Sequence, residues 1–165
     1  MTVLAVGKKA PDFTLPAMDG KAFSLREALN RGPVVAAFFK ISCPVCQYAF
    51  PFIERIYKAY DAKNVTIVGI SQNKQKDTAA FTKEYGMTFP VLLDDTDSYP
   101  VSNAYGLTNV PTIFWIDTDG TIEISSVGWV QQEIEEINQK VAQAGQSGLQ
   151  PVFLPGESIP AYRPG

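Results

Sequence analysis

The sequence predicts an α/β fold in which a mixed central sheet is flanked by helices, with an added N-terminal β-hairpin. The first observation is a strand–helix–strand order, in which the apolar runs 34–39 and 65–70 enclose a helical pattern. The second is a hairpin followed by a helix near the end of the chain. The third is the length, because 165 residues are the size of one ordinary domain with one core.

Turn and cap residues define the N-terminal elements. Asp19-Gly20 is a tight-turn pair between two short extended runs, at residues 13–15 and 22–24, which predicts the hairpin. Ser24 and Glu27 have the spacing of a capping box, so a short helix should begin there. Apolar and aromatic residues then recur at helical spacing from Cys46 to residue 60.

The second half of the chain alternates helical and extended patterns. We expect helices at residues 77–85, 99–105 and 130–144, and extended segments at residues 89–93, 112–117 and 121–125. We therefore predict a domain over residues 1–145. Residues 146–165 are rich in Pro and Gly, which predicts an extended tail packed on the same domain. The tail residues expected to make this contact are Val152, Phe153, Leu154 and Ile159.

Composition excludes several classes of function. A formal charge of −3 provides no general attraction to nucleic acid, and no apolar run reaches the length of a membrane span. The chain has no histidine, which excludes Ser-His-Asp and Cys-His catalysis and metal sites that use imidazole. Its two cysteines, Cys43 and Cys46, are too few for a disulfide framework or a four-thiolate site, so no metal is expected.

The N-terminal residues predict a cytoplasmic protein. A short apolar stretch precedes Lys8 and Lys9, whereas a secretory signal has its charges first and a longer apolar run after them. A reducing compartment would keep the cysteine pair largely reduced. If a leader has been removed from the chain, the expected location is extracytoplasmic instead.

The cysteine pair stands where the apolar run 34–39 gives way to a helix. A thiol at a helix N-terminus faces the positive end of the helix dipole and unpaired N–H groups, which favour the thiolate of Cys43. Cys46 follows one turn later, within reach of a short disulfide. Pro44 suits the first helical position, and Lys40 is a possible stabiliser of the thiolate. The alternative interpretations are a pair of buried, unreactive cysteines or half of a metal site.

Three stretches resemble the redoxin branch of the thioredoxin superfamily, which includes the TlpA/ResA-like thiol-disulfide oxidoreductases and the AhpC/TSA peroxiredoxins. Residues 7–20 are similar to the redoxin N-terminal hairpin. Residues 34–51 are similar to the strand, Cys-x-x-Cys motif and helix, and residues 105–120 to the segment around a cis-proline. Together they span residues 7 to about 145.

The resemblance implies a thioredoxin-like fold and a site. By the resemblance, the Val110–Pro111 bond should be cis and should bind substrate together with Pro44 and Val45. No cofactor is implied other than a redox-active disulfide between the two cysteines. The implied partners are a protein or small-molecule disulfide and a thiol electron donor.

Three departures from the family pattern stand out. Ala37 occupies the position of the buried Asp of thioredoxins, and Ala49 that of the Glu of ResA-like members. Ile41-Ser42 replaces the usual tryptophan before the first cysteine. Both positions associated with proton transfer therefore lack a carboxyl group. A base for Cys46 would then be water, the substrate thiol or another residue, with Glu54 and Asp94 as weak candidates.

Three functions remain in competition. The leading one is a thiol-disulfide oxidoreductase in which Cys43 attacks a substrate disulfide and Cys46 resolves the mixed disulfide. The alternative is a peroxiredoxin-type peroxidase, an antioxidant activity, with Cys43 peroxidatic and Cys46 resolving. That family has a hydroxyl where this chain has Lys40, and it has an activating Arg that residues 109–112 lack. The third is a binding domain whose cysteine pair is a redox-sensitive clip.

Overall fold

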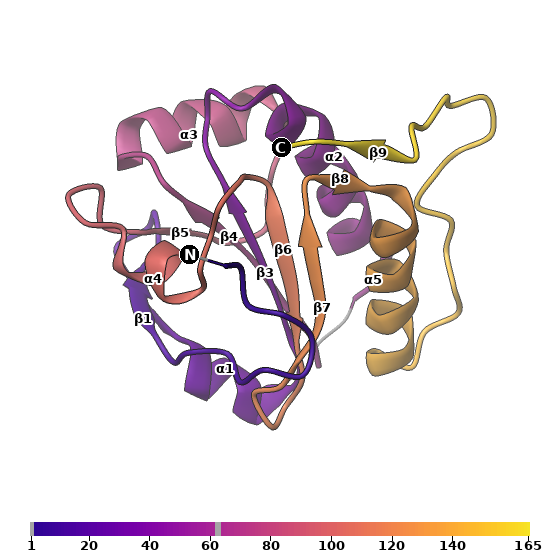
Figure 1. The fold of residues 1–165 in the computed structure, drawn as a ribbon. Coiled ribbons are helices and arrows are strands. Elements are labelled where there is room, and N and C mark those ends of the chain that lie inside the picture. Colours follow the sequence, from indigo (N-terminus) through magenta and orange to yellow (C-terminus); the bar gives the residue numbers. More distant parts are fainter. Residues whose placement is uncertain (1, 62–63) are drawn as a thin grey trace.

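A mixed five-stranded sheet forms the centre of the computed structural model, which describes residues 2–61 and 64–165 (Figure 1). The strand order is β5-β4-β3-β6-β7. β3 (Val34–Phe39) lies in the middle, parallel to β4 (Thr66–Ser71) and antiparallel to β6 (Thr112–Ile116). The outer strands are β5 (Val91–Leu93) and β7 (Ile122–Val127).

Every residue of β3 is buried because helices cover both faces of the sheet. On one face, Phe39 and its neighbours pack against α2 (Pro44–Ala59), α3 (Gln75–Glu84) and α5 (Gln131–Ala144). On the other face, the alternate residues of β3 pack against the N-terminal segment and two short helices. These helices are α1 (Leu25–Arg31) and α4 (Pro100–Ala104). The expected arrangement of a mixed sheet between helices is confirmed.

The predicted N-terminal hairpin is also confirmed. β1 (Thr14–Pro16) pairs antiparallel with β2 (Ala22–Ser24). Ser24 caps α1, since its Oγ accepts a hydrogen bond of 3.3 Å from the N–H of Glu27. The hairpin lies beside the main sheet through a bridge between Ala17 and Leu92.

The last helix starts one residue later than predicted. Trp129–Val130 forms a short strand, β8, that pairs antiparallel with β9 (Tyr162–Arg163) near the end of the chain. The paired residues are 32 and 34 positions apart in sequence, so the local helical pattern of this region carried no sign of the pairing. The helix predicted at residues 77–85 is α3, which starts two residues earlier, at Gln75, and ends at Glu84.

The C-terminal segment runs outside the helices and returns to the top of the view in Figure 1, beside the start of α2. Val152 is buried in the core, and Phe153 and Ile159 are partly buried against it. The expectation for Leu154 is wrong: its side chain is 50% exposed. The chain turns there, because the Leu154 N–H donates to Oε1 of Glu157 at 2.7 Å.

The described residues include no helix that combines the length and the apolarity of a membrane crossing. The division of the chain into a domain of residues 1–145 and a tail of residues 146–165 stays a prediction, since the segment's contacts with the core alone do not test it.

Candidate active site

The cysteine pair lies at the junction of β3 and α2, as the sequence predicts. Cys43 is the N-cap residue of α2 and has extended backbone angles, and Pro44 occupies the first turn. The backbone N–H of Cys46 donates to the Cys43 sulfur at 3.1 Å. The Cys43 sulfur therefore caps the helix as a Ser or Asp oxygen usually does. The N–H group of Cys46 that donates to this sulfur favours a negative charge on the sulfur.

The two thiols differ in their surroundings. Both cysteines are free; Cys43 is partly exposed, whereas Cys46 is fully buried among core residues. Burial raises the pKa of the Cys46 thiol, and the adjacent Cys43 side chain raises it further. Cys46 is thus held as the thiol at neutral pH, which leaves Cys43 as the sulfur that an incoming disulfide can reach.

The loop before Cys43 is held by amide side chains that the sequence analysis missed. The Ile41 N–H donates to Oδ1 of Asn73 at 2.9 Å, and Nε2 of Gln47 donates to the Ile41 carbonyl at 3.0 Å. Asn73 follows β4 and Gln47 belongs to the first turns of α2. No local motif marks either residue, because their role arises only when β4 and α2 meet at this edge of the sheet.

The Val110–Pro111 bond is cis, as the resemblance implied. The loop faces the cysteine pair: the Cys43 thiol donates to the carbonyl of Val110 at 3.4 Å. Pro111 is itself buried, and its carbonyl accepts from the N–H of Gly128 at 2.8 Å. The residue of this loop that meets Cys43 is therefore Val110, which is partly buried.

A cavity of about 470 Å³ opens beside Cys43. Lys40 and Pro44 lie on its wall, but Val45 does not; Val45 instead packs against the core. Lys40 is exposed and forms no ion pair with any described residue, and its effect on the thiolate stays a prediction. The other wall residues come from distant segments and were not predicted: Gln72, Tyr99, Ser102, Asn103, Leu107, Thr108, Asn109 and Gly165.

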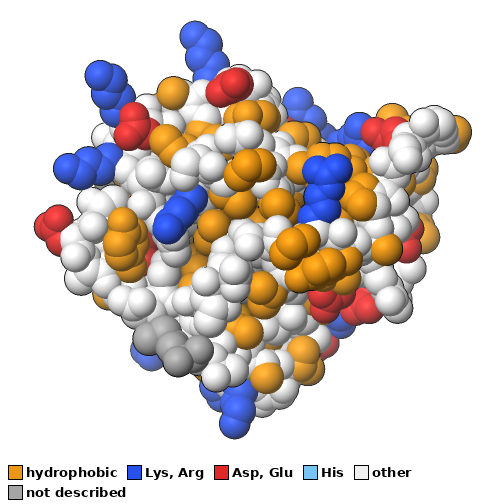
Figure 2. All heavy atoms as spheres, turned by 45° about the horizontal axis from the view of Figure 1, so that its top comes forward, with side chains coloured by type: hydrophobic (Ala, Val, Ile, Leu, Met, Phe, Trp, Pro, Cys, Tyr) orange, Lys and Arg blue, Asp and Glu red, His pale blue; other side chains and the backbone are white. Residues whose placement is uncertain are grey.

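Tyr99 has a left-handed backbone, with φ of 50°, which is uncommon for a residue other than glycine. It is the N-cap residue of α4, and α4 also contributes Ser102 and Asn103 to the cavity. The α4 side of the cavity wall is therefore formed by Tyr99, Ser102 and Asn103. Around this edge of the sheet, hydrophobic side chains gather on the surface with single Lys and Arg side chains among them (Figure 2).

Neither candidate acid is free to serve Cys46. The carboxylate of Glu54 accepts from the N–H and the hydroxyl of Thr88, at 2.7 Å and 2.6 Å. Asp94 accepts from the N–H and hydroxyl of Ser102, at 2.8 Å and 2.7 Å, and so holds the start of α4. Both carboxylates are engaged in these hydrogen bonds, and no hydrogen bond joins either of them to Cys46 within the described residues.

Ala37 and Ala49 lie in the same core cluster as Cys46, with exposures of 0% and 1%. At these two positions, where the family pattern has a carboxyl group, this chain has only a methyl group. In the part of the chain that the structure describes, no cluster of three or more His, Cys, Asp or Glu side chains could hold a metal.

Solved structures show which class of protein has this fold and site. A Bacteroides thetaiotaomicron protein assigned as a protein disulfide isomerase superposes with a TM-score of 0.78 at 26% identity, covering 90% of this chain and 96% of that one. A Chlorobium tepidum protein assigned as the thiol:disulfide interchange protein DsbE has a TM-score of 0.74 at 28% identity, covering 86% and 99%. The fold is thus thioredoxin-like, and the site defines the redoxin branch.

Sequence comparison gives the family. The AhpC/TSA family model matches residues 6–125. The thiol-disulfide oxidoreductase ResA of Geobacillus thermodenitrificans is 32% identical over 133 residues, which are 80% of this chain and 75% of that protein. The chain belongs to the AhpC/TSA family, and the resemblance drawn from the three sequence stretches is confirmed.

Proposed function

We propose that the protein is a thiol-disulfide oxidoreductase with Cys43 as its nucleophile and Cys46 as its resolving thiol. The observation that carries this proposal is the Cys43 sulfur at the start of α2, accepting the Cys46 N–H at 3.1 Å and facing the Val110 carbonyl at 3.4 Å. The ResA and DsbE relatives support it, because they carry that activity in their names.

The reaction proceeds by two exchanges at sulfur. The Cys43 thiolate attacks one sulfur of a substrate disulfide, so that a mixed disulfide forms and the other substrate sulfur leaves as a thiolate. Cys46 then loses its proton and attacks the Cys43 sulfur, which releases the first substrate sulfur. The substrate gains two electrons and two protons, and the protein is left with a Cys43–Cys46 disulfide.

An extended substrate would pair with the backbone of Val110, as peptides add to sheet edges. Pro44 and Val45 would contact it from the start of α2. The chemistry needs no cofactor beyond the cysteine pair. A thiol donor must reduce the disulfide again, and in the cytoplasmic location that we propose the net direction is reduction of the substrate.

Two serine variants test the assignment. Cys43→Ser and Cys46→Ser should each lose essentially all catalysed reduction of a protein disulfide by dithiothreitol. Only Cys46→Ser should accumulate a mixed disulfide with substrate, because it keeps the nucleophile and lacks the resolving thiol. Retention of turnover by Cys43→Ser would contradict the proposal.

The same samples address the peroxidase alternative. Consumption of hydrogen peroxide at catalytic rates, dependent on Cys43 and independent of Cys46, would replace the proposal by that alternative. If the folded wild-type protein catalyses neither reaction and binds a defined partner, the result favours a binding domain whose cysteine pair is a redox-sensitive clip.

A further inference from the structure

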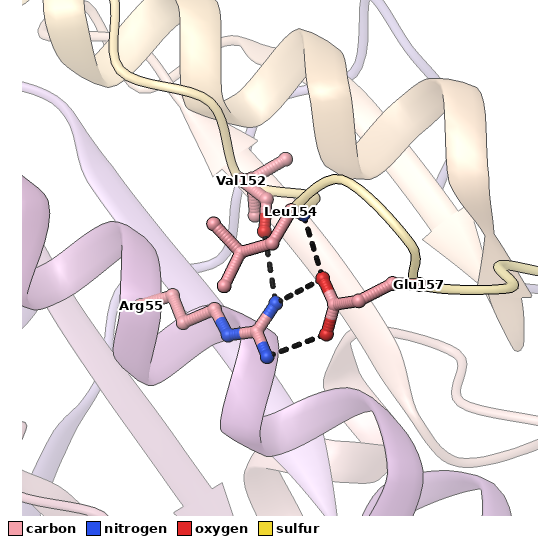
Figure 3. Close-up of polar contacts among 4 residues, drawn as sticks. All are labelled: Arg55, Val152, Leu154 and Glu157. Carbon is pink, nitrogen blue, oxygen red and sulfur yellow. Dashed lines mark hydrogen bonds and ion pairs between the residues drawn. The ribbon is translucent and has the colours of Figure 1, made fainter.

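The segment of residues 146–165, which we call the strap, is attached to the helix that carries the cysteines. Arg55 of α2 donates to both carboxylate oxygens of Glu157, each at 2.7 Å, and to the Val152 carbonyl at 3.2 Å (Figure 3). The same Glu157 carboxylate accepts the Leu154 N–H. This bidentate pair ties the middle of the strap to α2.

Beyond this anchor the strap turns toward the active site. Nε1 of Trp129 donates to the Pro160 carbonyl at 2.8 Å, and β9 pairs with β8. The guanidinium of Arg163 lies 4.6 Å from the ring centre of Tyr48, two residues after Cys46. The strap is therefore held along the first turns of α2, and its last residue, Gly165, reaches the wall of the cavity.

The end of the strap lies between the backbone at Gly128 and the backbone at Val110. A Cβ atom on Gly128 would stand 2.6 Å from the Arg163 carbonyl and 3.1 Å from the nitrogen of Gly165. A Cβ atom on Gly165 would clash with the carbonyl of Val110. Nδ2 of Asn109 donates to the Gly165 carbonyl at 3.1 Å. Glycines at both contacts let three backbone segments pack this closely.

This contact falls on the group that an extended substrate needs. The Val110 carbonyl faces the Cys43 thiol on one side and Gly165 on the other. Its backbone edge is thus covered by the chain itself. The approach that stays open to Cys43 is the cavity lined by Lys40, Gln72 and Asn103, which has room for a small molecule.

We propose that residues 162–165 are a specificity-determining wall that favours small-molecule disulfides over extended polypeptides. This inference rests on the proposed function and names its substrate class. A small disulfide enters through the cavity while the strap stays in place. A polypeptide must first displace the strap from Val110, so its rate is reduced by the fraction of time that the strap is bound.

The test compares two substrates with dithiothreitol as electron donor. The substrates are 2-hydroxyethyl disulfide and the disulfides of insulin. A variant that ends at Ala161 lacks β9 and the contact of Gly165 with Val110. Gly165 also lines the cavity, so the measured quantity is the ratio of the two rates. We expect the rate with insulin, divided by the rate with 2-hydroxyethyl disulfide, to rise by about tenfold, because only insulin competes with the strap for Val110.

Two point variants keep the test independent of shortening the chain. Gly165→Val should reproduce the effect, since its side chain cannot fit against the Val110 carbonyl. Leu154→Ala is the matched control: it lies in the strap, is half exposed and should leave both rates unchanged. Thermal unfolding of each variant verifies that it is folded.

Every result has a defined meaning. An unchanged ratio of the two rates, an equal rise of both, or a loss of both in folded variants would overturn the strap's role as a selective wall. If the wild-type protein reduces neither disulfide, the proposed function itself fails, and that result differs from all of the others.

Discussion

At the scale of single residues, the site depends on an asymmetry between two sulfurs three positions apart. Cys43 is partly exposed and accepts a backbone N–H, whereas Cys46 is buried and its pKa is raised. The first arrangement favours a nucleophile and the second protects the resolving thiol until a mixed disulfide has formed. The motif spacing predicts the pair, but only burial distinguishes the two roles.

The raised pKa of Cys46 predicts a pH-dependent reactivity. Only the thiolate reacts with iodoacetamide, so the rate of Cys46 alkylation should rise about tenfold per pH unit from pH 7 to pH 9, without a plateau. Quantitative mass spectrometry of the peptides that contain Cys43 and Cys46 measures the two rates separately. A plateau for Cys46 below pH 9 would show that burial does not hold it as the thiol.

At the scale of elements, α2 joins the site to the strap. Its first residue follows Cys43, and its fourth turn carries Arg55, which binds Glu157. Hydrogen bonds from Arg55 and from the Leu154 N–H lower the pKa of Glu157 to about 2. The helix pattern could be predicted from apolar spacing, whereas the Arg55–Glu157 pair joins residues 102 positions apart and has no local signal.

This ion pair predicts how the strap responds to acid. The pKa of Glu157 is lower in the folded protein than its ordinary value of 4.5, so the pair stabilises the attached strap above about pH 4.5 and is lost as the pH falls toward 2. Hydrogen-exchange protection of the Leu154 N–H should fall over this range, after correction for the intrinsic exchange rates.

The matched variants are Glu157→Gln and Glu136→Gln. The first should show weakened protection of Leu154 at every pH, because the amide replaces the bidentate carboxylate. Glu136 is exposed and forms no ion pair within the described residues, so its variant should behave as the wild type. Equal protection in both variants would mean that the ion pair does not hold the strap.

At the scale of the whole molecule, a buried polar contact connects two helices and the strap. The Tyr60 hydroxyl, at the end of α2, lies 2.9 Å from Oδ1 of Asn138 on α5 and accepts the N–H of Gln150 at 3.0 Å. Nδ2 of Asn138 donates to the Gln150 carbonyl at 2.7 Å. The first part of the strap, at Gln150, is thus fixed to the same layer of helices as its middle, at Glu157.

Removing this hydroxyl should destabilise the fold as a unit. Tyr60→Phe leaves the Gln150 N–H without its partner, and we expect the free energy of unfolding to fall by about 1–3 kcal/mol. Urea unfolding measures the difference, with Tyr57→Phe as the control because Tyr57 is 37% exposed. An equal stability of the two variants would show that the Tyr60 contact contributes nothing to the fold.

The sequence by itself determined the order of the helices and of the strands of the central sheet, the two hairpins and the cysteine pair at a strand–helix junction. These features depend on neighbours within a few residues: Asp19-Gly20 at a turn, Ser24 at a cap, Pro44 in the first turn of α2. Local sterics and hydrogen bonding act over that distance, so the pattern is readable along the chain.

The tertiary structure alone decided what surrounds the pair. It assigned Glu54 and Asp94 to backbone and hydroxyl donors, brought Asn73 and Gln47 to the loop before Cys43, and placed Gly165 against Val110. Each of these contacts joins segments that are neighbours only after the sheet and helices have packed. Their residues carry no periodicity or motif, because the partner that gives each its role lies elsewhere in the chain.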